Sequence, residues 1–189
     1  MTPLEVAIAV ARAFERAGIE YFLGGSMATS FQGQPRLTND LDFVVLLRAP
    51  QIATLKTELG AEFDVDEEAL AEAVRRKGSW NIFHVPTVTR IDLFVVKDTE
   101  YDAEEFVRRQ AWEVLPGQRV MLKAPEDSVL RKLLWFQAGG ESNSQQFRDV
   151  VEVLRVQGER LNVAYLDAWA RKLGIAALLA RAREAAQLQ

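Results

Sequence analysis

Two aspartates separated by a single residue, Asp40 and Asp42, have the side-chain type and spacing that suit metal chemistry. They run into the apolar residues 43–46, a pattern typical of a strand. Successive strand side chains point to opposite faces, so the two carboxylates are expected on one face, about 7 Å apart. Carboxylate oxygens at this spacing suit a hard cation such as Mg²⁺. The pattern therefore predicts a metal site on this strand.

A glycine-rich turn, Gly24-Gly25-Ser26, precedes the aspartates. It lies between residues 19–23, which read as a short buried strand, and residues that suit a helix. Glycine lets backbone come close to a ligand, and the start of a helix presents N–H groups to an anion. We expect a phosphate-binding turn beside the metal site. The alternative is a simple turn followed by a solvated strand face.

A third acid, Asp92, lies in the apolar stretch 88–96, which we expect to pair as a hairpin with residues 80–85. It is the natural third carboxylate for the site formed by Asp40 and Asp42. An isolated strand aspartate is otherwise a solvated edge residue, and that alternative stays open. The single histidine, His84, is expected to have a structural role.

Composition indicates a soluble globular chain. Its 189 residues are 49% hydrophobic and 26% charged, and they include no cysteine. The sequence contains neither a run of about 20 apolar residues nor a signal-peptide pattern. We therefore expect a cytoplasmic protein with no membrane association.

The net charge of −4 is unevenly distributed. Residues 126–189 carry nine Lys or Arg and eight Asp or Glu, whereas residues 1–125 carry 14 and 19. An acidic N-terminal part suits metal binding and lacks the basic field of a general nucleic-acid-binding surface.

The fold class predicted from these patterns is α/β, with a mixed sheet flanked by helices and then a C-terminal helical lobe. Thr2 is expected to cap the first helix, and Asp66 and Asn162 to cap later ones. We place the α/β domain at residues 1–124 and the lobe at 125–189. Helices are expected at 3–17, 51–59, 67–77, 101–109, 126–138, 145–156, 163–172 and 175–186, and a last hairpin at 112–122.

The lobe contributes three polar candidates, Lys132, Arg148 and Asp149. Lys132 is expected at the edge of an apolar helical arc, and Asp149 shares its helix face with apolar residues. Two alternatives stay open. Lys132 is either a site residue or a boundary lysine with an apolar stem, and Arg148 is either a site residue or a surface partner of Glu152.

The Leu-Gly-Gly-Ser turn followed by Asp-Leu-Asp resembles the nucleotidyltransferase superfamily that includes DNA polymerase β and the kanamycin nucleotidyltransferases. The resemblance implies a nucleotidyltransferase-type sheet. It also implies that Asp40, Asp42 and Asp92 hold one or two Mg²⁺ ions, with Mn²⁺ as an alternative. Gly24, Gly25 and Ser26 would hold the triphosphate of an NTP such as ATP.

The motif Arg36-x-Thr38-x-Asp40-x-Asp42, with the later Pro-Glu-Asp, Lys and Arg-Asp, resembles the abortive-infection type nucleotidyltransferases, which are toxins of toxin–antitoxin pairs. This resemblance implies that Lys132 contacts nucleotide phosphates and that Asp149 supports the catalytic site. Arg36, Thr38 and Arg148 are the further nucleotide-binding candidates, and an antitoxin protein is the implied partner.

Two functional classes follow. The first is an enzyme that transfers NMP from an NTP to a hydroxyl acceptor, with the acceptor left open among tRNA or other RNA, protein and small molecules. The second is an inactive nucleotide-binding module or antitoxin partner with the same fold. Loss of one acid or of the glycine turn is typical of the second class, and this sequence retains all of them.

Overall fold

The computed structural model describes residues 1–187 of the chain, and these residues form two compact units. The first unit comprises residues 1–27 and 37–123, and the second comprises residues 28–36 and 124–187. The main break lies one residue before the boundary expected at 124/125. Residues 28–36 were predicted to belong to the α/β domain, whereas the structure groups them with the C-terminal helices.

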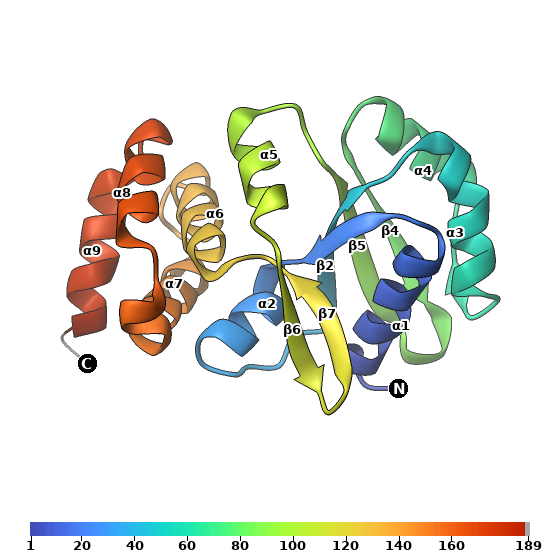
Figure 1. Cartoon of the computed structure of the whole chain (residues 1–189), viewed down its shortest axis with the longest axis horizontal. Coiled ribbons are helices and arrows are strands. Elements are labelled where there is room, and N and C mark those ends of the chain that lie inside the picture. The colour runs from blue at the N-terminus through green and yellow to red at the C-terminus, as the bar shows by residue number, and fades with distance from the viewer. Residues whose placement is uncertain (188–189) are drawn as a thin grey trace. The chain divides into compact units, whose positions relative to one another are not determined.

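The first unit contains all the strands that the structure describes between residues 1 and 187 (Figure 1). Its elements are α1 Pro3–Arg16, β1 Glu20–Leu23, β2 Asp40–Leu46, η1 Ala49–Gln51, α3 Ile52–Leu59, β3 Phe63–Asp64, α4 Glu67–Arg75, β4 Ser79–His84, η2 Val85–Thr87, β5 Thr89–Val95, α5 Glu100–Val107, β6 Gln110–Leu115 and β7 Gln118–Leu122. Helix α2, Gly25–Gln32, begins in the first unit and ends in the second. The second unit continues with α6 Pro125–Ala138, α7 Ser144–Gln157, η3 Gly158–Arg160, α8 Val163–Lys172 and α9 Ala176–Gln187.

The strands form one mixed sheet in the order β3-β4-β5-β2-β1-β7-β6. The strand that carries Asp40 and Asp42, β2, runs antiparallel to β1 and parallel to β5. The expected hairpins are confirmed as the antiparallel pairs β4–β5 and β6–β7. The two-residue strand β3 was not predicted, because a segment this short shows no alternation. The predicted fold class, a mixed sheet flanked by helices and followed by C-terminal helices, is confirmed.

The two faces of the sheet are covered by different helices of the first unit. On one face, Phe14 of α1 packs against Tyr21 and Phe43, with ring centroids 5.3 Å from each. On the other face, Phe22 packs against Phe106 of α5 at 5.7 Å. Because strand side chains alternate, Phe22 and Asp42 belong to the same face. The acids of β2 therefore lie on the face that α5 covers.

Predicted helix starts are confirmed by their capping contacts. Thr2 forms a complete capping box with Glu5 at the start of α1. The Asp66 side chain accepts from the Ala69 N–H, and the Asn162 side chain accepts from the Tyr165 N–H.

The second unit buries its own apolar core, to which residues 28–36 are packed closely. Gln157 of α7 donates a buried hydrogen bond to the Gln32 carbonyl at 2.6 Å. A Cβ at Gly33 would lie 3.0 Å from the backbone nitrogen of Val153, so the loop after α2 rests directly on α7. The core side chains of this unit come from four helices and the turn before α9: Val129, Leu130, Leu133, Phe136, Val150, Val153, Leu154, Leu166, Ile175 and Leu179.

Candidate functional site

The glycine turn joins β1 to α2, as predicted, and is bound to the acid-bearing strand. The Gly24 N–H donates to the Asp42 carbonyl at 2.7 Å. Gly25 begins α2 with φ at +55°, and a Cβ there would lie 1.8 Å from Oδ2 of Asp42. Both the backbone conformation and the close approach of a carboxylate therefore require glycine at position 25. Ser26 follows in the first turn of the helix.

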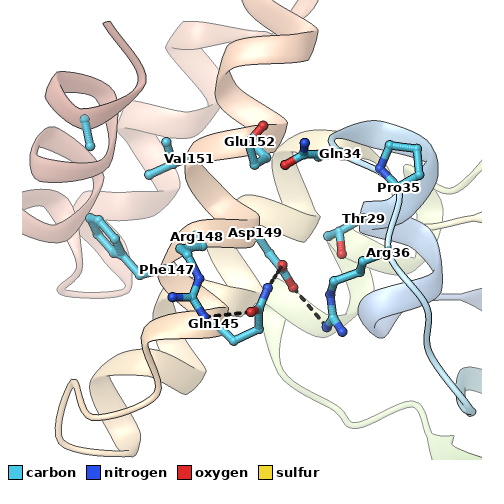
Figure 2. Close-up of a pocket in the computed structure, with 11 residues that line it drawn as sticks. Thr29, Gln34, Pro35, Arg36, Gln145, Phe147, Arg148, Asp149, Val151 and Glu152 are labelled. Atoms are coloured by element: carbon cyan, nitrogen blue, oxygen red, sulfur yellow. Dashed lines mark hydrogen bonds and ion pairs between the residues drawn. The ribbon is translucent and has the colours of Figure 1, made fainter. Parts of the chain in front are cut away.

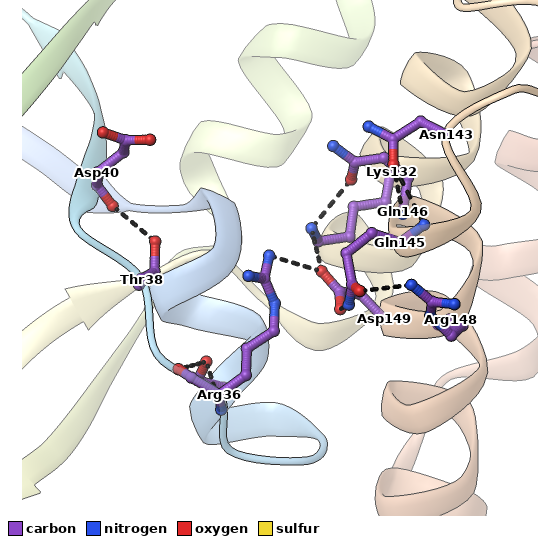
Figure 3. A network of polar contacts seen from close by, with 10 residues as sticks. Arg36, Thr38, Asp40, Lys132, Asn143, Gln145, Gln146, Arg148 and Asp149 are labelled. Atoms are coloured by element: carbon purple, nitrogen blue, oxygen red, sulfur yellow. Dashed lines mark hydrogen bonds and ion pairs between the residues drawn. The ribbon is translucent and has the colours of Figure 1, made fainter.

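Two of the three predicted acids are direct neighbours across β2 and β5. Asp42 and Asp92 are register partners on these parallel strands, and both side chains are half-buried. Asp40 is opposite Arg90 and is exposed, and its carbonyl accepts a 3.3 Å hydrogen bond from the Thr38 hydroxyl (Figure 3). The strand that carries Asp92 is thus the direct neighbour of the strand that carries Asp40 and Asp42.

Arg90 contacts the candidate site and was not predicted. Its guanidinium binds the Asp92 carboxylate, with Nη2 2.8 Å from Oδ1 and a hydrogen bond from Nε at 2.9 Å. The two residues are separated by one position on a strand, so they share a face. That period-two relation is visible in the sequence and would have identified the pair.

Within residues 1–187, no three His, Cys, Asp or Glu side chains form a group arranged to hold a metal ion. The chemistry of the adjacent Asp42 and Asp92 nevertheless fits Mg²⁺, because this ion binds through one or two carboxylates together with substrate phosphates and waters. The three-carboxylate set of Asp40, Asp42 and Asp92 stays a prediction.

Replacement of Gly25 by Ala is expected to lower the free energy of unfolding by about 2 kcal/mol or more and to weaken nucleotide binding. The Cβ strains a left-handed backbone and displaces the Asp42 carboxylate. Chemical denaturation and NTP titration calorimetry measure the two effects.

The matched control for this variant is Gly117→Ala, at φ +71° with nothing within 4 Å of its Cβ. This variant introduces backbone strain without a steric clash. Its free energy of unfolding should fall by about 1 kcal/mol, and its affinity for nucleotide should not change. Equal effects of the two substitutions on nucleotide affinity would contradict the role of Gly25 beside Asp42.

The polar candidates of the second unit form one connected network around Asp149 (Figure 3). The Lys132 ammonium donates to Asp149 Oδ2 at 2.7 Å and to Gln146 Oε1 at 3.0 Å. Arg36 lies 3.3 Å from the same carboxylate oxygen, and the amide of Gln145 donates to Oδ1 at 2.7 Å. The structure thus brings together Arg36, Lys132 and Asp149, three of the residues that the resemblance identified.

Lys132 is buried, which corrects its expected position at the edge of an apolar arc. Its side chain is 9% exposed, because the ammonium points to Asp149. The helical pattern did not show that a carboxylate on α7 would pair with it. Asp149 is buried too, in agreement with the apolar character of its helix face.

Arg148 is exposed and joins the same network through Gln145, whose Oε1 accepts from Nη2 at 2.8 Å. The alternative partner considered for it, Glu152, instead pairs with Arg155. Gln145 was not predicted, since an amide in the first turn of a helix has no distinctive sequence signal.

A pocket of about 430 Å³ lies in the second unit beside this network (Figure 2). Figure 2 shows Arg36 and Asp149 on facing walls, with Gln145 and Arg148 beside Asp149. The remaining lining residues are Thr29, Gln34, Pro35, Phe147, Val151, Glu152 and Ala185. The pocket combines two guanidinium groups, two carboxylates and an apolar surface, which suits an organic ligand with polar groups.

The Asp149 carboxyl stays ionised. Burial raises its pKa, but the hydrogen bond and charge of Lys132, together with Gln145 and Arg36, outweigh burial and place the pKa below its ordinary value. Because the folded pKa is lowered, this carboxylate stabilises the fold fully above its unfolded pKa of about 4. That stabilisation is lost as the pH falls through the lower folded pKa.

We expect the difference in unfolding free energy between wild type and Asp149→Asn to be constant above about pH 5 and to shrink below about pH 4. Urea denaturation at a series of pH values measures this difference. A difference that does not change from pH 7 to pH 3 would contradict the ionised network.

The acids of the Pro-Glu-Asp segment have structural roles. Glu126 accepts from the Asn162 N–H at 2.8 Å, and Asp127 accepts from the Tyr165 hydroxyl at 2.7 Å, so both fix the start of α8 to α6. His84 is also consistent with a structural role, because it is buried and its Nδ1 lies 2.6 Å from the Thr87 hydroxyl.

The fold is similar to that of an antigenic nucleotidyltransferase-like protein from Paracoccidioides brasiliensis, with 17% sequence identity, 94% of this chain and 91% of that chain covered, and a TM-score of 0.50. It is also similar to the antibiotic-resistance factor ANT(2'')-Ia, with 13% identity, coverage of 94% and 96%, and a TM-score of 0.54. No family model matches the sequence, and no curated protein matches it. At these identities the likeness establishes a nucleotidyltransferase-like fold.

None of the helices within residues 1–187 has the length and apolar character needed to span a bilayer.

Proposed function

We propose that this protein is a metal-dependent nucleotidyltransferase that transfers NMP from an NTP to a hydroxyl acceptor and releases pyrophosphate. The observation that carries the proposal is the contact between Gly25 and Asp42, with Asp92 beside Asp42 in register. A glycine turn of the kind that suits phosphates and two carboxylates suited to a cation thus belong to one small region of the first unit. The nucleotidyltransferase-like fold supports the same reaction.

The residues divide the work as follows. Asp42 and Asp92, with Asp40 as the third acid, would hold Mg²⁺. When bound, this ion acts as a Lewis acid toward the phosphates and lowers the pKa of the acceptor hydroxyl. Gly25 and Ser26 bind phosphate oxygens through the start of α2. In the second unit, the Lys132, Arg36 and Arg148 cations are assigned to the nucleotide, as the family resemblance implies.

We also propose candidates for the acceptor and for the biological role. tRNA or another RNA end, a protein hydroxyl and a small molecule are the candidate acceptors, and a toxin paired with an antitoxin is the candidate role.

The test is incubation of the protein with each labelled NTP and Mg²⁺, together with cellular RNA, cellular protein or small hydroxyl compounds. Label transferred to one fraction, with release of pyrophosphate, supports the proposal and identifies the acceptor class. Binding of an NTP without transfer to any fraction contradicts it.

The ion pair between Arg90 and Asp92 favours a second candidate, an inactive nucleotide-binding module or antitoxin partner. A guanidinium on the third acid competes with a metal for the same oxygens. If this pair suppresses metal binding, Arg90→Gln should tighten Mg²⁺ binding in calorimetry. Mg²⁺ binding by wild type that Arg90→Gln does not tighten contradicts this candidate.

A further inference from the structure

A buried ion pair lies next to the glycine turn and has no part in the mechanism described so far. The Lys123 ammonium is 2.9 Å from Oε1 of Glu105, and these side chains are only 7% and 3% exposed. Lys123 immediately follows β7, and its N–H donates to the Leu23 carbonyl at 3.0 Å, one residue before the turn. Glu105 lies on α5.

The surroundings of this pair would accept apolar side chains. The Lys123 ammonium is 5.3 Å from the centroid of the Phe22 ring, which in turn packs on Phe106. Removing two charges from water is costly, and buried ion pairs can often be replaced by packed apolar residues without loss of stability. Stability alone therefore gives little reason for a lysine at this position.

The glycine at position 24 suggests that the Lys123 ammonium acts at the turn. Its φ lies outside the left-handed region, so the backbone conformation does not require glycine there. A Cβ at this position would instead lie 3.3 Å from Cε and 3.6 Å from Nζ of Lys123. The absence of a side chain therefore lets the end of the buried lysine lie directly against the turn.

Lys123 lies in an acidic part of the protein, where a bound polyphosphate would be repelled by the surrounding negative charge. Lys123 lies over Phe22, on the sheet face that also carries Asp42 and Asp92. The first unit has 19 Asp or Glu and 13 Lys or Arg, so its overall field repels phosphate. A desolvated ammonium beside the turn offsets this repulsion locally, because charges interact more strongly away from water.

We propose that Lys123, held in place by Glu105, binds a phosphate group of the polyphosphate chain at the glycine turn. This inference rests on the proposed function for the identity of the ligand, an NTP. Glu105 is a positioning residue, since it acts through Lys123.

The experiment measures binding of inorganic tripolyphosphate by calorimetry, together with the KM for NTP. In Lys123→Met/Glu105→Gln both charges are removed, so neither partner is left buried and unpaired. We expect the Kd for tripolyphosphate to rise about 10-fold or more, as for a lost hydrogen bond to a charged group. The KM for NTP should rise by a similar factor.

The matched control is Lys56→Met/Glu67→Gln, which removes an exposed ion pair of 2.8 Å from the same unit. It should leave the Kd unchanged. Gly24→Ala is a second test that keeps both charges and pushes the end of the lysine away from the turn, and it should weaken tripolyphosphate binding by about 3-fold or more.

The outcomes separate this inference from the proposed reaction. Tripolyphosphate binding by wild type without any transfer of label contradicts the reaction and leaves the Lys123 site standing. Unchanged affinity in the folded double variant and in Gly24→Ala overturns the Lys123 site, as does equal weakening in the Lys56/Glu67 control. Absence of tripolyphosphate binding by wild type overturns it too.

Discussion

Asp42→Asn is expected to reduce NMP transfer by about 10³-fold or more and to weaken Mg²⁺ binding. Asp42 is the acid that contacts Gly25 of the glycine turn and is paired in register with Asp92. The substitution removes the charge that would hold the ion, and the amide keeps the size of the carboxyl group. Because Asp42 is half-buried, the fold should be retained, with a change in unfolding free energy of about 1 kcal/mol.

Single-turnover transfer from labelled NTP and calorimetric titration with Mg²⁺ measure these two effects. Asp64→Asn provides the control, since Asp64 is an exposed strand aspartate of the same sheet. It should behave as wild type in both measurements. Binding of Mg²⁺ and NTP by Asp42→Asn with wild-type affinity would refute the metal site, whatever the activity.

Lys132→Ala is expected to lower kcat by about 10²-fold or more, in the range of a lost electrostatic contact to a developing charge. Its ammonium donates hydrogen bonds to Asp149 and Gln146, so we also expect this variant to have a substantially lower free energy of unfolding. Breaking a buried pair costs about 3–5 kcal/mol, and a value near 2–3 kcal/mol is expected here because Arg36 and Gln145 still bind the carboxylate.

A boundary lysine would affect stability only slightly, so the larger loss expected for buried Lys132 makes a control essential. Lys172→Ala removes an exposed lysine of the same unit and should leave kcat unchanged. Lys132→Arg should recover only part of the activity, since a planar guanidinium does not reproduce a compact ammonium. Wild-type turnover by Lys132→Ala, measured at a temperature where the variant is folded, would refute the role.

Local patterns predicted much of this molecule, because each depends on neighbours in sequence. Thr2 and Glu5 cap the first helix by hydrogen bonds between residues three apart in sequence. The alternation of buried and exposed side chains around Asp42 follows from strand geometry. The turn at Gly25 was found for the same reason. These features needed no knowledge of the rest of the fold.

Long-range partners were predicted less well. The pairing of Lys123 with Glu105, and of Lys132 with Asp149, joins segments whose approach depends on the packing of whole elements. Helical periodicity placed Lys132 beside apolar residues, but it carried no information on which charge would meet it. The grouping of residues 28–36 with the C-terminal helices likewise depends on contacts that no local pattern contains.

That grouping has a consequence for the order of events on the ribosome. Gln32 receives its buried hydrogen bond from Gln157, which is 125 residues later in the chain. At about 5–20 residues per second, synthesis of that interval takes roughly 6–25 s. During this time the segment 28–36 has been synthesised but its partner helix has not, so this hydrogen bond remains unmade. The helical unit can therefore close only after α7 has emerged, so a chain that stops before α7 leaves this segment without its partner helix.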